Sequence, residues 1–144
     1  MKVINPFHLA FPVTNLQTAR DFYIGELGAE EARSDKEWVD FNFFGHQLSA
    51  HLVNEISSVK PILKDVDGDN IPIPHFGIIL EKSVWDILAN QFIGGEIDFL
   101  LPPKLRFRGT VAEQWSMFFY DPFNNGIEFK SFENSDLIFQ VNEQ

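Results

Sequence analysis

Apolar and polar residues alternate with a period of two over residues 7–13, which predicts a strand with one buried face. His8 falls on the opposite, more polar face of this strand. Over residues 16–27 the apolar positions recur every three or four residues, the spacing of a helix. Thr14 or Asn15 can cap its start, and Gly28 ends it.

The remainder of the first half predicts further strands. A short segment at residues 29–33 is followed by β-prone stretches at 38–44 and 47–53, with Gly45-His46 as a tight hairpin turn between them. Residues 54–72 are polar and rich in Pro and Asp, which indicates a linker or surface loop. The predicted order up to this linker is β-α-β-β-β.

The same order then restarts. Residues 73–80 predict a strand and residues 84–93 a helix that ends at Gly94-Gly95. A strand at 96–101, a long loop at 101–114, and strands at 115–120 and 127–132 around a turn at 121–126 complete the half. The sequence therefore predicts an α+β fold of two tandem βαβββ modules. One domain, 1–144, would contain module 1–54 and module 72–134, joined by a polar linker at 55–71.

Composition narrows the classes of partner. The chain has 144 residues, the size of one domain, with 11 Lys+Arg against 21 Asp+Glu and a formal net charge of −10. This charge disfavours nucleic acids and anionic membranes, because both are bound by clustered cations. The N-terminal residues lack the apolar core of a signal peptide, and no stretch is long enough to span a membrane, so we expect a cytoplasmic protein.

The chain has no Cys, so a metal site would have to use His and carboxylate ligands. His8 and His75 occupy equivalent places in the first strand of each half, and we interpret His51 and Glu128 as equivalent in the last strands. A single strand histidine is usually structural, but four such residues opposite the apolar faces of matching strands favour a shared metal site. If two curved sheets face each other, these side chains point into the cavity between them.

Such nitrogen and oxygen donors suit Mn, Fe, Co, Ni or Zn. His8, His75 and Glu128 alone form a two-His-one-carboxylate set, which leaves coordination positions open in non-haem iron oxygenases. His51 is either a fourth ligand or an acid/base group beside the metal.

Three cations are candidates for contacts to substrate. Arg106 and Arg108 lie in the predicted loop 101–114 and could bind a carboxylate in a forked geometry, and Lys130 shares a strand face with Glu128. His46, in the predicted turn, has the opposite parity to His51 and is not included in the site.

Five stretches in order resemble the vicinal oxygen chelate superfamily, the glyoxalase / bleomycin resistance protein / extradiol dioxygenase family. They are FHLAFPV, TARDFYIGELG, DFNFFGHQLSAHL, PHFGIIL and FFYDPFNNGIEFKSF. The resemblance covers essentially the whole chain and implies a glyoxalase-like fold whose curved mixed sheets surround a metal-binding cavity. It places His8, His51, His75 and Glu128 at the four metal-ligand positions; the second is often Glu or Gln in glyoxalase-like members.

The resemblance implies one divalent metal ion per site, with Fe(II) or Mn(II) favoured and Ni, Co or Zn as alternatives. Three protein ligands would leave room for a catechol-type substrate and O2, which favours a dioxygenase-like oxidoreductase. Four would leave two positions, which suits a glyoxalase-like lyase or isomerase. A non-catalytic drug- or metabolite-binding resistance protein is the third alternative. The resemblance also implies a homodimer that acts on a small molecule, with the metal site within one chain or shared between two.

Overall fold

The computed structural model of the chain describes residues 4–141, and the chain forms two compact units, Met1–Ser58 and Val59–Gln144. Residues 1–3 of the predicted first module lie outside the described residues. No helix within residues 4–141 is long and apolar enough to cross a membrane.

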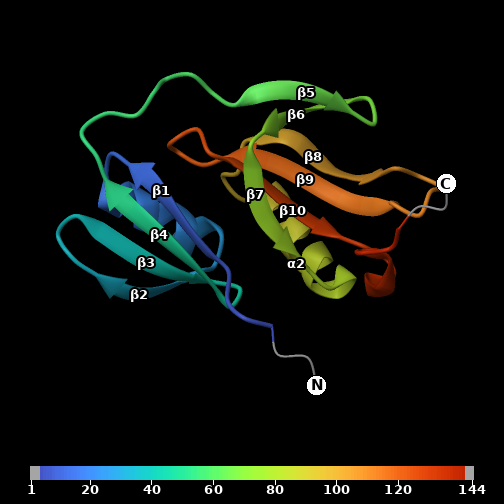
Figure 1. Cartoon of the computed structure of the whole chain (residues 1–144), viewed down its shortest axis with the longest axis horizontal. Coiled ribbons are helices and arrows are strands. Elements are labelled where there is room, and N and C mark those ends of the chain that lie inside the picture. The colour runs from blue at the N-terminus through green and yellow to red at the C-terminus, as the bar shows by residue number, and fades with distance from the viewer. Residues whose placement is uncertain (1–3, 142–144) are drawn as a thin grey trace. The chain divides into compact units, whose positions relative to one another are not determined.

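The first unit is one four-stranded sheet with a helical segment. Its elements are β1 (His8–Val13), α1 (Leu16–Arg20), a π-helical continuation η1 (Asp21–Glu26), β2 (Glu30–Ser34), β3 (Trp38–Phe43) and β4 (His46–Leu52). The strands lie in the order β1-β4-β3-β2, with β1 parallel to β4 and the other pairs antiparallel (Figure 1).

Local sequence signals set the helix and the hairpin of this unit. The Asn15 side chain caps α1 by accepting a 2.8 Å hydrogen bond from the main-chain N–H of Thr18, as predicted. Gly28, with φ of +79°, follows the helical segment. The β3–β4 turn lies at Phe44 and Gly45, one residue earlier than predicted, and both residues have the positive φ that a tight hairpin turn requires.

Aromatic residues form the core of the first unit. Tyr23 is fully buried between Phe11 and Phe41, with ring centroids 5.2 and 5.3 Å apart. Phe11 comes from the apolar face of β1, so the predicted alternation of this strand is confirmed. Phe7, predicted on the same face, precedes the strand and is 61% exposed.

The second unit repeats this arrangement and adds a hairpin before it. Its elements are β5 (Ile62–Val66), β6 (Asp69–Ile73), β7 (His75–Ile79), α2 (Lys82–Gly94), β8 (Phe99–Arg106), β9 (Gln114–Tyr120), β10 (Gly126–Ser131) and a 3-10 turn, η2 (Ser135–Leu137). The main sheet has the order β7-β10-β9-β8, with β7 parallel to β10. Because the first sheet has the same order, the prediction of an α+β fold with two βαβββ modules is confirmed.

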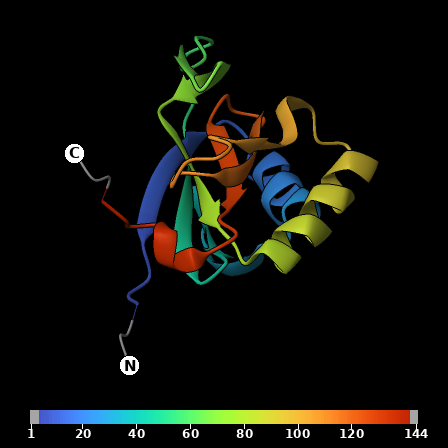
Figure 2. The same cartoon turned by 90° about the vertical axis from the view of Figure 1, so that its right-hand side faces the viewer.

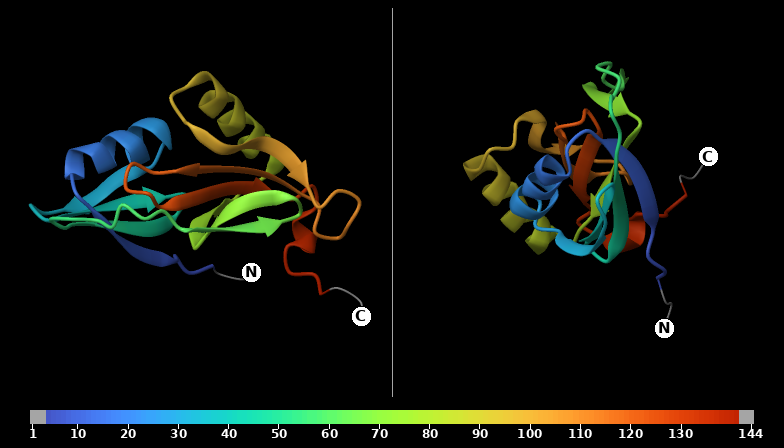
Figure 3. Two further views of the ribbon diagram at one scale, coloured as in Figure 1. Left: turned by 90° about the horizontal axis from the view of Figure 1, so that it is seen from above. Right: turned by 90° about the vertical axis from the view of Figure 1, so that its left-hand side faces the viewer.

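A helix covers one face of each sheet, as Figures 2 and 3 show for α2 and the helical segment of the first unit. In the second unit Phe92 of α2 packs against Phe119 and Phe129 of the sheet, with ring centroids 5.4–5.7 Å apart. Trp85 of the same helix donates a buried 2.9 Å hydrogen bond to the main-chain oxygen of Phe129. The apolar backs of the strands are therefore covered within each unit.

The predicted polar linker at 55–71 is not a surface loop over most of its length. Strands β5 and β6 pair in an antiparallel hairpin that turns at Asp67 and Gly68, which have φ of +54° and +81°. Asp-Gly between two alternating stretches is a strong hairpin signal, but the flanking Pro and Asp residues are also typical of loops.

The predicted loop at 101–114 is also wrong in its first part. Strand β8 extends to Arg106, so the loop spans only residues 107–113. Pro102 and Pro103 lie where the register of this edge strand shifts between Leu101 and Lys104, a place at which a strand tolerates residues without an N–H donor.

Candidate metal centre

Two of the predicted metal ligands meet within the second unit. His75 begins β7 and Glu128 lies in the middle of β10, the neighbouring parallel strand. The Nε2 atom of His75 is 3.0 Å from Oε2 of Glu128, and the Glu128 side chain is 8% exposed. This half of the predicted site is therefore assembled by a single pair of strands.

Glycines oppose both members of this pair. Gly126 is the cross-strand partner of His75, and Gly77 is the partner of Glu128. A Cβ atom on Gly126 would lie 2.7 Å from the Pro72 ring and 3.2 Å from the His75 Cβ atom. A Cβ on Gly77 would lie 1.6 Å from the main-chain oxygen of Glu128. The two glycines thus permit the close approach of the chain segments that carry His75 and Glu128.

The imidazole of His75 is held from its other side. Its Nδ1 atom is 2.7 Å from the main-chain oxygen of Pro72, and a carbonyl oxygen only accepts hydrogen bonds. Nδ1 therefore carries a proton, and Nε2 faces Glu128. The edge-to-face contact with Phe118, with centroids 5.0 Å apart, also restrains the ring.

The carboxylate of Glu128 is held in the same way. The hydroxyl of Ser116 on β9 donates a 2.9 Å hydrogen bond to Oε1, which leaves Oε2 toward His75. Burial raises the pKa of Glu128, but the hydrogen bond from His75, the charge of Lys130 and the Ser116 hydroxyl outweigh it and lower that pKa overall. The hydrogen bond to Glu128 raises the pKa of His75 despite burial of the ring.

This pair fits a divalent metal of the Mn to Zn series. Two ligands at right angles on a metal with bonds of about 2.1 Å lie about 3.0 Å apart, and the Nε2–Oε2 distance is 3.0 Å. The donors are one imidazole nitrogen and one carboxylate oxygen, which suit metals of borderline hardness. Because His75 donates through Nδ1 to Pro72, the lone pair of Nε2 can serve a metal once its proton leaves.

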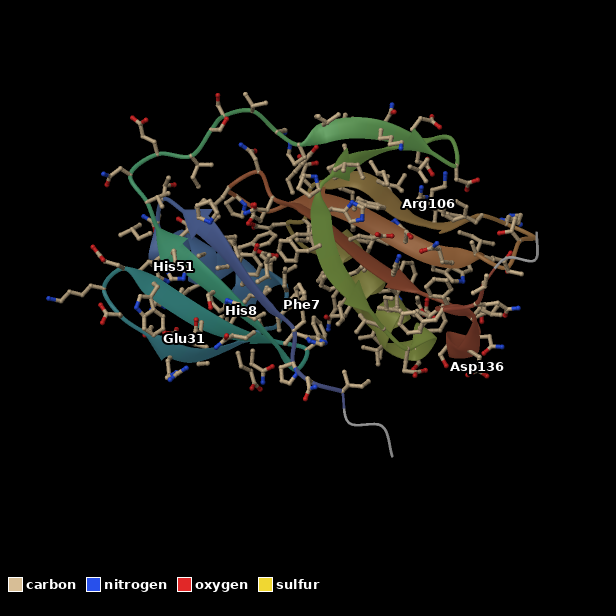
Figure 4. All side chains as sticks on the ribbon, viewed as in Figure 1. Phe7, His8, Glu31, His51, Arg106 and Asp136 are labelled. Atoms are coloured by element: carbon tan, nitrogen blue, oxygen red, sulfur yellow. The ribbon has the colours of Figure 1, made fainter. Side chains whose placement is uncertain are left out.

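The first unit carries the other two predicted ligands, His8 on β1 and His51 on β4, both exposed (Figure 4). His8 is the cross-strand partner of Gln47, and His51 is the partner of Pro12. The two histidines are thus offset by four residues, about 13 Å along the strands at about 3.3 Å per residue. His75 and Glu128 are offset by only two residues, or about 7 Å.

The prediction that His51 and Glu128 occupy equivalent places is therefore wrong. In each sheet the counterpart of Glu128 lies two residues beyond the partner of the first-strand histidine, and in the first unit that residue is Ser49. Lys130 lies two residues beyond Glu128, as His51 lies beyond Ser49. Alternation has a period of two, so it could not distinguish His51 from Ser49.

Asp40 and Ser49 are buried polar residues of the first unit that were not identified from the sequence. Asp40 on β3 is 6% exposed and accepts hydrogen bonds from Ser49 and Gln47 on β4. Both donors lie on the same face of β4 as His51, and Gln47 is the partner of His8. Asp40 is a polar residue among Phe residues, on the strand face turned away from the helix. This pattern could have identified it from the sequence, and Ser116 in the second unit as well.

Arg106 is engaged within the protein rather than on a loop. It is 3% exposed, donates 2.6 Å to the main-chain oxygen of Val66 and 3.2 Å to Asp69, and so fastens the β5–β6 hairpin to β8. The expectation of a loop arginine at this position is wrong. Arg108 lies in the loop at 107–113 and is exposed, and half-buried Lys130 stands two residues from Glu128.

Among the described residues, no group of three or more His, Asp or Glu side chains forms a complete metal site. Of the predicted set, His8 and His51 belong to the first unit, and His75 and Glu128 belong to the second.

Comparison with known proteins supports the interpretation of the fold. No family model matches the chain, and no curated protein matches it. Among solved structures, a glyoxalase/bleomycin resistance protein/dioxygenase from Alicyclobacillus acidocaldarius is 31% identical, with a TM-score of 0.79 over 94% of this chain and 96% of the other.

Two more distant structures share the fold alone. A glyoxalase/dioxygenase from Nostoc punctiforme is 19% identical, with a TM-score of 0.65 over 91% of this chain and 97% of the other. The fosfomycin resistance protein FosX from Listeria monocytogenes is 15% identical, with a TM-score of 0.63 over 95% and 98%. With the identity and coverage of the Alicyclobacillus structure, the repeated βαβββ topology shows that this chain belongs to the glyoxalase/bleomycin resistance protein/dioxygenase family of the vicinal oxygen chelate superfamily.

Proposed function

We propose that the protein is a divalent-metal-dependent enzyme that acts on a small substrate with two neighbouring oxygens, as a dioxygenase on catechol-type compounds. The observation that carries this proposal is the His75–Glu128 pair, in which one nitrogen and one oxygen stand at the separation of two ligands of one metal. Fe(II) and Mn(II) suit this donor set and this chemistry.

We propose His8 as the third ligand. It begins β1 as His75 begins β7, and the two strands occupy the same place in sheets of the same order. Along their paired strands, His8 and His51 are offset by four residues, whereas His75 and Glu128 are offset by two. This larger offset favours a ligand set without His51. His51 would then stand near the substrate as an acid/base group rather than on the metal.

A set of three supports oxygenase chemistry over lyase or isomerase chemistry. Three protein ligands leave three positions of a six-coordinate metal, enough for two substrate oxygens and O2. A divalent metal held there would stabilise negative charge on the substrate oxygens as a Lewis acid. Lys130, on the same strand face as Glu128, is the candidate to contact an anionic group of the substrate, with Arg108 as a weaker one.

We also propose a homodimer. His8 would come either from the same chain as His75 and Glu128 or from a second copy. Mixing a His8→Ala chain with a Glu128→Gln chain distinguishes the two arrangements. A site shared between chains regains one complete ligand set in the mixed dimer, and a site within one chain regains none.

Reconstitution with Fe(II) without oxygen, followed by addition of O2 and a panel of catechols, tests the activity. We expect O2 uptake that depends on Fe(II) and on Glu128. Metal-dependent turnover without oxygen would establish the glyoxalase-like alternative instead. Ligand binding that chelators do not alter would indicate a binding protein.

A further inference from the structure

We propose that Ser116 is a positioning residue for the metal centre. Its hydroxyl fixes the Glu128 carboxylate so that Oε2 alone faces the nitrogen of His75. This inference rests on the proposed metal-dependent function, and it assigns a role to a residue outside the predicted ligand set.

The contact comes from the strand opposite β7. Glu128 lies on β10 between β7 and β9, and both neighbours reach its carboxylate diagonally. The direct partner of Ser116 is Lys130, and the direct partner of Glu128 on β9 is Phe118. Ser116 therefore reaches the carboxylate from one side, while His75 reaches it from the other.

The hydroxyl is well placed to orient the carboxylate. Ser116 is fully buried, and its Oγ lies 2.9 Å from Oε1, while Oε2 lies 3.0 Å from His75 Nε2. With Oε1 occupied by a donor, rotation of the carboxylate would break a buried hydrogen bond. Such bonds to metal-ligating groups fix their orientation and contribute strongly to metal affinity.

The two ligands are therefore restrained from both ends. The main-chain oxygen of Pro72 orients the imidazole through Nδ1, and the hydroxyl of Ser116 orients the carboxylate through Oε1. Successive polar contacts link the Pro72 oxygen to His75, His75 to Glu128, and Glu128 to Ser116. Of these four groups, only the Ser116 hydroxyl can be replaced without removing a ligand or altering the main chain.

The chain supplies a matched control in Ser131. This residue is also fully buried, on β10, and within the described part of the chain its hydroxyl has no hydrogen-bond partner. Loss of either hydroxyl removes one buried oxygen atom, but only Ser116 contacts Glu128. An effect of buried volume or polarity alone would appear in both variants.

Titration of the full-length protein with Co(II) tests the proposal, with the dissociation constant taken from chelator competition and the ligand geometry from the visible spectrum. We expect Ser116→Ala to weaken binding about tenfold or more and to change the Co(II) spectrum. Ser131→Ala should change neither. Equal affinities and spectra in the two variants would overturn the role of Ser116, while Co(II) binding by the unchanged chain would still support the metal site.

A second pair of variants covers the case in which Ser116→Ala does not fold. Ser116→Thr and Ser116→Val have the same shape and differ in the hydroxyl, so strain from the added methyl groups is common to both. We expect the Thr variant to retain affinity and the Val variant to bind about tenfold more weakly. Equal binding by both would contradict the proposal. Failure of the unchanged chain to bind Co(II) at all would instead contradict the proposed function.

Discussion

Gly126 lies directly opposite His75 in the parallel pair of β10 and β7, and the missing side chain leaves room for the Pro72 ring and the Cβ atom of His75. We expect Gly126→Ala to lower the free energy of unfolding by about 1–3 kcal/mol, because overpacking displaces neighbouring groups. It should also weaken metal binding, because His75 must move. Chemical denaturation and Co(II) titration measure the two effects.

Gly94 provides the control for this substitution. A Cβ atom there would meet nothing within 4 Å, and the residue ends helix α2. Gly94→Ala should therefore leave stability unchanged or raise it by up to about 1 kcal/mol. A loss at Gly94 as large as that at Gly126 would show that crowding at His75 is not the cause.

Replacement of the histidines of the first unit should separate their roles. His8 corresponds to His75 in strand position, whereas His51 lies four residues beyond the partner of His8. We expect His8→Ala to weaken Co(II) binding more than tenfold, because loss of a group that only orients a ligand already costs about 10–100-fold, and His51→Ala to change it little. A His51→Ala chain that loses metal affinity as His8→Ala does would contradict the three-ligand set.

Most of the fold could be predicted because the local signals agree with it. Asn15 and Gly28 bound the first helix, and period-two alternation marks β1 and β10. Register is a different matter, because alternation fixes only the face of a residue. It therefore could not show that Ser49, rather than His51, is the counterpart of Glu128.

The groups that orient His75 and Glu128 also could not be predicted from the alternation of apolar and polar residues. The Ser116 hydroxyl reaches Glu128 from the neighbouring strand, and the Pro72 main-chain oxygen reaches the ring of His75 three residues on. Alternation shows neither contact, because it fixes only the face on which a residue lies. Arg106 shows the same limit. Its role depends on pairing with Asp69, 37 residues away, in a hairpin that lies within the predicted linker.

Metal binding should stabilise the protein against unfolding. A ligand at one hundred times its dissociation constant stabilises the folded state by about 2.7 kcal/mol when the unfolded chain does not bind it. For a chain of this size that corresponds to a rise in Tm of roughly 8 °C. Glu128→Gln should abolish the rise, since it removes the buried carboxylate beside His75. Differential scanning fluorimetry with and without Co(II) measures both, and an equal rise in the Gln variant would contradict the site.

The ion pair between Arg20 and Glu31 should contribute to stability in a pH-dependent way. The guanidinium donates two hydrogen bonds of 2.9 Å to the carboxylate, and these lower the pKa of Glu31. A group with a lowered pKa contributes its full stability above its unfolded pKa, and loses it as the pH falls through the folded value. A double-mutant cycle of Arg20→Met and Glu31→Gln should give a coupling of about 0.5–1 kcal/mol at pH 7. We expect the coupling to disappear as the pH falls through the lowered pKa of Glu31, and a coupling that stays constant with pH would contradict this account.

Arg106 should stabilise the β5–β6 hairpin rather than bind substrate. Arg106→Met removes the hydrogen bonds to Val66 and Asp69 but keeps much of the apolar stem, and Lys104 still contacts Asp69. We therefore expect a loss of about 2–4 kcal/mol, somewhat less than for a fully broken buried ion pair. Hydrogen exchange should show the loss first at the amides of β5 and β6. Arg108→Met, on the exposed loop, is the matched control and should leave exchange unchanged. If the hairpin is equally protected in both variants and only Arg106→Met reduces substrate affinity, the results would support a substrate-binding role for Arg106 instead.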